Sequence, residues 1–376
     1  MTLPNTTGWF RRLLLPGLVF QSVVIAGGYG TGRELAEFFL GYGPKLGLLS
    51  MVLISTTIWS LVCALSFEFA RKVGATDYRT FFTALVGRGW VLYEISYAGL
   101  LVIIMAVIAS AAGSILEETF LLPYWLGVVG IIAAIGFLVF RGSAAVEKAM
   151  ASWSGVLYAV YLILFVWSLV RFGPEIADGL RGPVPAGAEG WPVGGLRYAA
   201  YNVALIPALL FATRHLETRR DAVTAGLLAG PIAMVPAILF FTVMSGFYPE
   251  IADRSVPANA LLEALGSRTF QIVFQIVLFG TLIETGTGMI HGLNERIGNA
   301  VEAAGRTMAS WVRPVVALAL LLLGAFLARF GLIDLIARGY GTLTWAFWLV
   351  YLLPLFTIGV WRLARMDHRP VPQSEG

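Results

Sequence analysis

The chain has 376 residues, of which 58% are hydrophobic and only 13% are charged, against about 25% charged residues in an ordinary soluble domain. This composition excludes a soluble enzyme and predicts a protein embedded in a lipid bilayer. The formal net charge is +4, but the basic residues are spread between apolar runs, so we expect no nucleic-acid partner. The single cysteine, Cys63, lies in an apolar run, which excludes an intramolecular disulfide.

Ten apolar runs approach the roughly 20 helical residues that are needed to cross the hydrocarbon layer. They cover residues 13–40, 44–70, 90–116, 123–140, 149–171, 195–213, 221–247, 269–293, 312–330 and 333–362. Of the Lys and Arg residues between these runs, 17 fall on one predicted side of the membrane and 8 on the other. Because cytoplasmic loops carry the excess of basic residues, we expect a multi-pass protein of a bacterial cytoplasmic (inner) membrane with both termini in the cytoplasm.

A Pro- and Gly-rich stretch divides the ten runs five and five. We predict a first five-helix repeat at 1–171, an extracellular linker at 172–194 and a second five-helix repeat at 195–376. Because five is odd, the second half enters the membrane from the opposite side, which makes an inverted-topology repeat of the kind found in secondary transporters. Ten helices can divide into two halves of similar spacing by chance, so the spacing of the runs alone does not establish an inverted repeat.

The centre of the first run contains four glycines followed by two formal charges. It consists of Ala26, Gly27, Gly28, Tyr29, Gly30, Thr31, Gly32, Arg33 and Glu34. Each glycine costs about 1 kcal/mol in a helix interior, and a charge at the bilayer centre costs about 3 kcal/mol. We therefore predict an unwound segment whose free carbonyls hold a cation and whose free N–H groups bind a solute's carboxylate. A small-residue packing seam is the alternative, but it does not explain the charges.

The sixth run, at the matching position of the second half, has a mid-span proline. Pro207 follows the polar pair Tyr201 and Asn202, and proline removes a backbone donor and frees a carbonyl. Two interrupted helices at matching positions point to a central substrate site, where Tyr201, Asn202 or Glu284 would take an amino group. An ordinary kink at Pro207 is the alternative.

The eighth run supplies the candidate ion-coupling residues. Thr281, Glu284 and Thr285 share one helical face, and their oxygens suit a hard monovalent cation, while Glu284 can also carry a proton. The threonines could instead bond to their own helix carbonyls. Sodium and proton coupling both stay open.

Two further segments carry predictions about the outer face. Arg33, near Glu37, and Asp334 could form a charge pair that closes an outer vestibule, although charges at helix ends mostly face water. Residues 257–266 read as a short amphipathic helix at the membrane interface.

The run from Ile25 to Phe39, IAGGYGTGRELAEFF, resembles the first-span signature of the YkvI-type bacterial membrane proteins. Tyr201 to Pro207 with Arg214-His215-Leu216, and Gly286 to Ile290 with Asn294-Glu295-Arg296, resemble its other landmarks. That family is similar in architecture to the amino acid, polyamine and organocation transporters, which share the five-plus-five inverted-repeat fold of the sodium-coupled amino acid symporters (the LeuT fold). The resemblance covers nearly the whole chain.

In those symporters an arginine beyond the unwound part of span 1 pairs with an acidic residue of span 10, which Arg33 and Asp334 would match. Their second sodium site combines span 1 carbonyls with two adjacent hydroxyl residues of span 8. Here the resemblance implies a sodium ion at Ala26 and Thr285, but Glu284 replaces the other hydroxyl. Proton-coupled relatives often place a lysine within span 5. Lys148 lies at the cytoplasmic entrance of that span, which is too shallow to match this lysine.

The sequence thus predicts an all-α membrane protein of ten helices with broken spans 1 and 6. We expect an ion-coupled secondary transporter of a small amino acid or related organic solute, working by alternating access. A solute-sensing receptor of the same fold, which binds without transporting, is the alternative. We expect no enzyme, because no HExxH motif or pair of intramembrane aspartates occurs, and no cofactor other than a sodium ion; the oligomeric state is not predicted.

Overall fold

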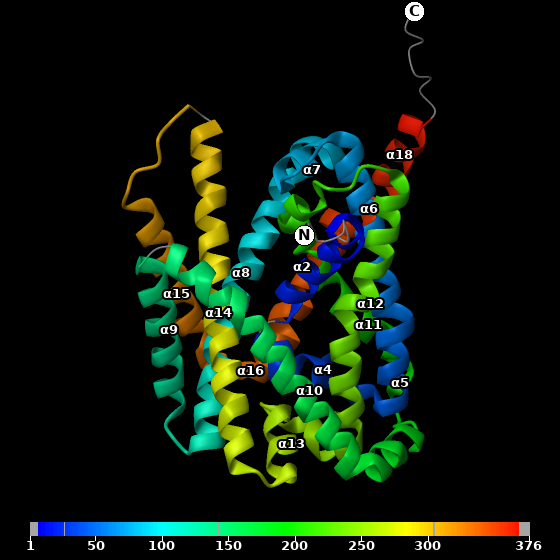
Figure 1. The fold of residues 1–376 in the computed structure, drawn as a ribbon, viewed down its shortest axis with the longest axis vertical. Helices are drawn as coiled ribbons and strands as arrows, with labels where there is room; N and C mark the ends of the chain where they lie inside the picture. Colours follow the sequence, from blue (N-terminus) through cyan, green and yellow to red (C-terminus); the bar gives the residue numbers. More distant parts are fainter. Residues whose placement is uncertain (1–6, 26, 142, 304, 368–376) are drawn as a thin grey trace, which may run out of the picture.

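The computed structural model of the protein describes residues 7–25, 27–141, 143–303 and 305–367. Within these ranges all regular secondary structure is helical, and the long helices stand side by side in one bundle (Figure 1). The predicted all-helical fold is confirmed.

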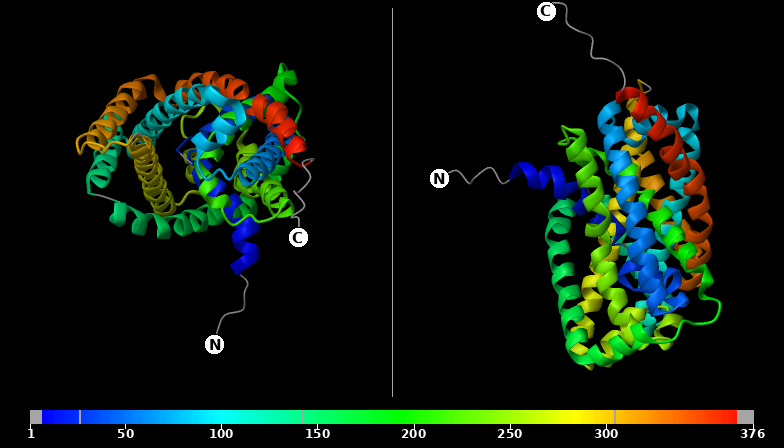
Figure 2. Two further views of the ribbon diagram at one scale, coloured as in Figure 1. Left: turned by 90° about the horizontal axis from the view of Figure 1, so that it is seen from above. Right: turned by 90° about the vertical axis from the view of Figure 1, so that its right-hand side faces the viewer.

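The described part of the first half begins with a broken helix, which is followed by long helices. The elements are α1 (Thr7–Trp9), η1 (Phe10–Leu14), α2 (Leu15–Val24), α3 (Gly27–Gly30), α4 (Arg33–Phe38), η2 (Leu40–Tyr42), α5 (Pro44–Leu49), η3 (Ser50–Ser55), α6 (Thr56–Val73), α7 (Tyr78–Val86), η4 (Gly87–Gly89), α8 (Trp90–Phe120), α9 (Tyr124–Arg141) and α10 (Ser143–Arg181), where η marks a 3-10 or π-helical turn. The short α1 and η1 project sideways from the bundle (Figure 2).

The second half begins with a bent helix pair, and its last helix runs continuously from Gly331 to Met366 with π-helical turns within it. Its elements are η5 (Ala188–Gly190), α11 (Trp191–Val203), η6 (Ile206–Thr213), α12 (Arg219–Met244), η7 (Ser245–Phe247), η8 (Glu250–Asp253), α13 (Pro257–Leu265), α14 (Arg268–Ala303), α15 (Val312–Leu327), η9 (Ala328–Phe330), α16 (Gly331–Asp334), η10 (Leu335–Tyr340), α17 (Gly341–Phe347), η11 (Trp348–Leu352), η12 (Leu355–Gly359) and α18 (Val360–Asp367). We call the two ends of the bundle the α7 end and the α13 end, after the helices that lie there (Figure 1).

Among the described residues, six helices are long and apolar enough to cross a membrane, or seven if the bent pair Ala188–Val203 and Ile206–Thr213 counts as one span. Helices α9 and α15 are apolar but shorter. Each of the ten predicted runs forms helical structure, whereas the count of ten membrane spans stays a prediction.

Helix starts at the α7 end follow from local sequence. Asp77 precedes α7 and accepts a hydrogen bond from the backbone N–H of Thr80. Thr218 and Asp221 form a reciprocal capping box at the start of α12. Each cap satisfies N–H groups that the first turn of a helix leaves without an intrahelical partner, typically stabilising the helix by about 1 kcal/mol.

The segment predicted as a linker, 172–194, is partly helical. Helix α10 continues to Arg181 and bends at Phe172, whose backbone has φ −121° and ψ 22°. The bend places Pro174 near the start of the helical piece that follows, where a missing N–H breaks no intrahelical bond. Only the stretch between Arg181 and Ala188 lacks regular helix.

The long helices pack in two groups that the view in Figure 1 separates. Helix α12 packs against α6 and α2, and η6 packs against both of these; we call these elements, with α11, the bundle group. Helices α8, α9, α14 and α15 pack against one another and form the scaffold group. The short helix α3 contacts α8 and α14, so the first broken helix lies where the two groups meet.

Helix α13 closes the α13 end of the molecule. Its residues Ala258, Asn259, Leu261 and Leu262 are buried, so it packs onto the protein and is not the interfacial surface helix that we expected. The physical reason is its polar side chain: Asn259 donates to the Glu118 carboxylate at 3.0 Å.

The same amide ties α13 to the scaffold group. The Asn259 side-chain carbonyl accepts hydrogen bonds from Thr119 of α8, at 3.0 Å, and from Gln275 of α14. Buried polar groups of this kind specify one arrangement of neighbouring helices, because each would be costly without its partners.

We predict that Gly226→Ala destabilises the protein by about 2 kcal/mol, because overpacking a close helix contact costs about 1–3 kcal/mol. A Cβ atom there would lie 2.2 Å from the Ala64 Cα and 2.3 Å from its N, which are backbone atoms that cannot rotate away. Thermal unfolding of detergent-purified protein can be followed through the reaction of the buried Cys63 thiol with a fluorescent maleimide. Gly130→Ala is the control, since nothing lies within 4 Å of its Cβ position; equal midpoints for the two variants would contradict the prediction.

Candidate functional site

The first broken helix changes direction around its glycines. Helix α2 ends at Val24, and Ile25 leaves helical geometry with ψ 75°. Gly32 adopts φ 81°, a left-handed conformation that favours glycine, between α3 and α4. Ala26 lies outside the described residues, so the span 1 half of the predicted sodium site is not described.

The polar groups of this break find partners from other helices. The Gly30 carbonyl accepts a hydrogen bond from the Tyr161 hydroxyl of α10 at 2.6 Å. The Thr31 hydroxyl donates to the Gly28 carbonyl at 3.0 Å, and the Thr31 carbonyl accepts from the N–H of Ala258 in α13, also at 3.0 Å. The break is therefore covered by protein, as irregular backbone at membrane depth must be.

The second broken helix bends by 57° between α11 and η6. The carbonyl of Ala204, at the bend, accepts a hydrogen bond from the Tyr93 hydroxyl of α8 at 2.9 Å. Asn202 donates to the Tyr198 carbonyl of its own helix, and Pro207 is buried in the first turn of η6. The predicted breaks of spans 1 and 6 are both confirmed.

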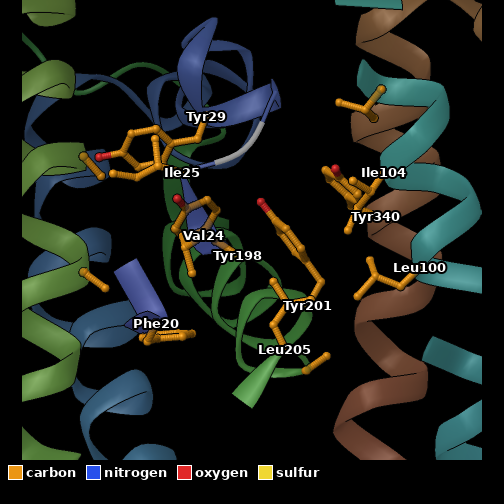
Figure 3. Packing of buried hydrophobic residues seen from close by; sticks show 14 of the residues in the cluster. Phe20, Val24, Ile25, Tyr29, Leu100, Ile104, Tyr198, Tyr201, Leu205 and Tyr340 are labelled. Atoms are coloured by element: carbon orange, nitrogen blue, oxygen red, sulfur yellow. The ribbon is translucent and has the colours of Figure 1, made fainter. Parts of the chain in front are cut away.

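A hydrogen bond between buried side chains joins the two broken helices. The Tyr201 hydroxyl donates to Glu34 Oε2 at 2.6 Å, and the exposed fraction of Glu34 is 2%. The Tyr201 ring stacks on Tyr340, with 4.5 Å between ring centroids and 12° between planes. Figure 3 shows Tyr198 and Tyr201 lying between the α2–α3 break and Tyr340.

Glu34 is the residue that the sequence analysis did not assign to the site. In the sequence, the charge of Glu34 indicates only that the first helix is broken, and the neighbouring Arg33 is the residue predicted to form a gate. The signal was nonetheless present, because an acidic residue within an apolar span is itself a marker of function.

A cavity of about 1450 Å³ runs from the α7 end toward the breaks. At its outer end it is lined by Thr76, Asp77 and Arg79, which are exposed. At its inner end it is lined by Ile25 and Leu205, which flank the two breaks. None of the described residues of α13 line it, and its exposed lining residues Thr76, Asp77 and Arg79 place its opening at the α7 end.

The predicted site residues fall into two sets. Pro207, Thr281, Glu284 and Thr285 line the cavity. The others are buried beyond its inner end and do not line it; these are Gly28, Tyr29, Gly30, Thr31, Gly32, Tyr201 and Asn202. For Gly27 the structure describes the backbone alone.

In the cavity set, the polar side chains of α14 differ in their partners. Thr281 donates to the carbonyl of Val277 in its own helix at 3.0 Å, which is the alternative that we considered for the threonines. Glu284 is half-buried and forms no ion pair among the described residues. Glu295, the other carboxylate with which the described part of α14 lines the cavity, pairs instead with Arg313 at 2.8 Å.

The α13 end is closed by Arg33. Its guanidinium donates to the carbonyls of Ala252 and Arg254 at 2.6 and 3.0 Å and to the Glu37 carboxylate at 3.1 Å. Asp334 is exposed and pairs with Arg338 at 3.3 Å. The structure thus pairs Arg33 within its own helix and with the η8 backbone, and does not bring it together with Asp334.

Among the described residues, no group of three or more His, Cys, Asp or Glu side chains is placed to hold a metal ion. The oxygen groups that face the cavity from α14 are those that suit a monovalent ion.

The comparison with known proteins supports the fold. No protein-family model matches the chain. In sequence it is similar to the uncharacterized membrane protein YkvI of Bacillus subtilis, with 23% identity over 294 residues that cover 74% of this chain and 79% of YkvI.

Three solved structures are similar to it. They are MhsT in complex with L-phenylalanine (TM-score 0.62, 16% identity, 94% of this chain and 97% of MhsT), a Na⁺-coupled sialic acid symporter in a substrate-bound outward-open state (0.62, 12%, 94% and 78%), and the manganese transporter of Eremococcus coleocola (0.55, 16%, 94% and 80%). The chain therefore has the LeuT-type fold, and the resemblance to YkvI-type membrane proteins and LeuT-fold transporters is confirmed.

We predict that Arg33→Ala lowers the free energy of unfolding by about 3 kcal/mol, since removing one partner of a buried ion pair costs about 3–5 kcal/mol. Its side chain is 5% exposed, whereas that of Arg338 is 86% exposed. Arg338→Ala is the matched control and should cost less than about 1 kcal/mol. Denaturation of both variants in the same detergent provides the measurement, and equal losses would show that the Arg33 contacts contribute no more than a surface pair.

Proposed function

We propose that the protein is an ion-coupled secondary transporter of a small amino acid or related organic solute, working by alternating access. The observation that carries the proposal is the cavity, which is open at the α7 end, closed at the α13 end and bounded at its inner end by two broken helices. A site reached from one side of a broken-helix pair is the arrangement that alternating access requires.

The predicted topology indicates which side of the membrane the open end of the cavity faces. The positive-inside bias assigns the α7 end to the cytoplasm, so the structure corresponds to an inward-facing state. Transport would then involve movement of the bundle group against the scaffold group, which closes the cavity and releases the Arg33 contacts at the α13 end. Two of the solved structures of similar fold support this proposal, because they are named as a Na⁺-coupled sialic acid symporter and a manganese transporter.

Glu284 is the proposed coupling residue. It lies on the scaffold helix α14 and faces the cavity together with Thr285. An ion bound there would neutralise a carboxylate that is partly removed from water, and so would favour the state in which the cavity closes over it. One of the similar structures is Na⁺-coupled, which supports sodium as the ion, and a proton is the other candidate.

The test is electrophysiology on proteoliposomes adsorbed to a solid support. Pools of the common amino acids and of their decarboxylated amines are applied in sodium and in choline buffers at two pH values. A sustained solute-dependent current that requires sodium or an inward proton gradient would support coupled transport. Solute-dependent thermal stabilisation without any current in every buffer would instead identify a sensor.

We predict that Glu284→Gln reduces ion-dependent solute accumulation at least about tenfold, equivalent to ~1.4 kcal/mol of coupling free energy, while the protein stays folded. The amide keeps the size of the side chain but neither carries a proton nor neutralises a cation. Glu302→Gln is the control, because Glu302 is an exposed carboxylate of the same helix. Unchanged accumulation at every pH and sodium concentration would place the coupling site elsewhere.

A further inference from the structure

A carboxylate of the protein occupies the backbone pocket that we expected a solute's carboxylate to occupy. A Cβ atom on Gly28 would lie 2.3 Å from Glu34 Oε1 and 2.7 Å from Glu34 Cγ. The Glu34 side chain therefore folds back from α4 over the backbone of α3. The glycine is required because the carboxyl group lies directly against it.

This carboxylate has no cation of its own. Within the described ranges no Lys, Arg or His forms an ion pair with Glu34. Arg33 is adjacent in sequence, but its guanidinium points to η8 and Glu37. Among the described residues, the side-chain hydrogen bond to Glu34 comes from Tyr201. A buried carboxylate without a counter-ion is costly, so it is neutralised either by a proton or by a bound cation.

The surroundings of Glu34 suit an ammonium group. The ring of Tyr201, which bonds to this carboxylate, stacks on Tyr340 and meets Tyr198 edge-on, with 4.5 and 5.7 Å between ring centroids. The hydroxyl group of Tyr198 is buried and has no hydrogen-bond partner among the described residues. A phenol oxygen accepts hydrogen bonds, an ammonium offers three N–H donors, and aromatic faces attract cations.

We infer that the cargo is an organic amine that binds through its ammonium group to Glu34 and the tyrosines around it, Tyr198, Tyr201 and Tyr340, and that carries no α-carboxylate. The inference rests on the proposed transport function and narrows its solute class. An amino acid placed in the same position would bring its own carboxylate next to that of Glu34, and like charges in a buried site repel strongly. A divalent metal ion fits less well, because it takes six or more ligands, usually with more than one carboxylate.

The Tyr201 hydroxyl has a defined part in this scheme. It donates to Glu34 in the structure, and the cavity lining ends at Ile25 and Leu205. Tyr201 therefore takes the place of an ammonium N–H while the carboxylate is shielded from the cavity. Binding of an amine exchanges this donor for the cargo's own and leaves the phenol oxygen free to accept from it.

The experiment uses the full-length protein in detergent and matched probes. Alanine, leucine, phenylalanine and lysine are each compared with the amine left by removing the carboxyl group and with the acid left by removing the α-amino group. The thermal unfolding midpoint is measured over a concentration series of each probe. At least one amine should raise the midpoint and bind about tenfold more tightly than its parent amino acid, whereas its acid should produce no shift.

Variants separate the role of Glu34 from general effects on the fold. Glu34→Gln should abolish the amine shift, and Glu117→Gln, an exposed carboxylate of α8, should retain it. Glu34→Gly should reverse the preference in favour of the amino acid, because it opens the space above Gly28 for the solute's carboxylate. This gain of binding requires a folded protein, so it cannot be mistaken for unfolding.

The inference is overturned if a wild-type amino acid binds as tightly as its amine, if no amine shifts the midpoint, or if Glu34→Gln leaves the amine shift intact. Coupled currents with amino acids but not with amines would overturn the inference and leave the transport proposal standing. Amine binding without current under any ion gradient would do the reverse.

Discussion

The constraint on which the structure depends is that interrupted backbone inside an apolar bundle must find partners from other helices. Tyrosine hydroxyls supply several of these partners: Tyr161 reaches the Gly30 carbonyl and Tyr93 reaches the Ala204 carbonyl. These bonds extend from α10 and α8 to the two breaks. The broken helices are thus held open by the unbroken ones, and a polar site exists at the centre of a chain that is otherwise strongly apolar.

The site that results has two levels. The cavity is lined by Glu284 and Thr285 and is reached from the α7 end. Beyond its inner end, Glu34 and the tyrosines form a second, enclosed level. In the functions proposed above, an ion binds at the first level and the ammonium of the cargo at the second. Glu284 and Glu34 lie at different levels, so the two positive charges do not compete for the same group.

Much of this arrangement follows from the sequence. Hydrophobicity over a span is set by many residues together, so the helices and both breaks were predictable, and the glycines around Gly28 marked the first break. The partners across helices were not predictable, because they depend on how side chains meet in space. Glu34 could have been suspected from its position, but its bond to Tyr201, 167 residues away, could not, and the same holds for Arg33 and the η8 carbonyls.

The closure at the α13 end depends on one guanidinium that binds two backbone carbonyls, whereas the packing of α12 on α6 involves close backbone approaches along both helices. The contacts of this guanidinium nonetheless belong to the fold as well, since they join segments that lie 219 positions apart in the sequence. A change of residue 33 that loosens this end of the molecule therefore also lowers its stability. Variation at this position is limited in a way that variation at an exposed residue such as Arg338 is not.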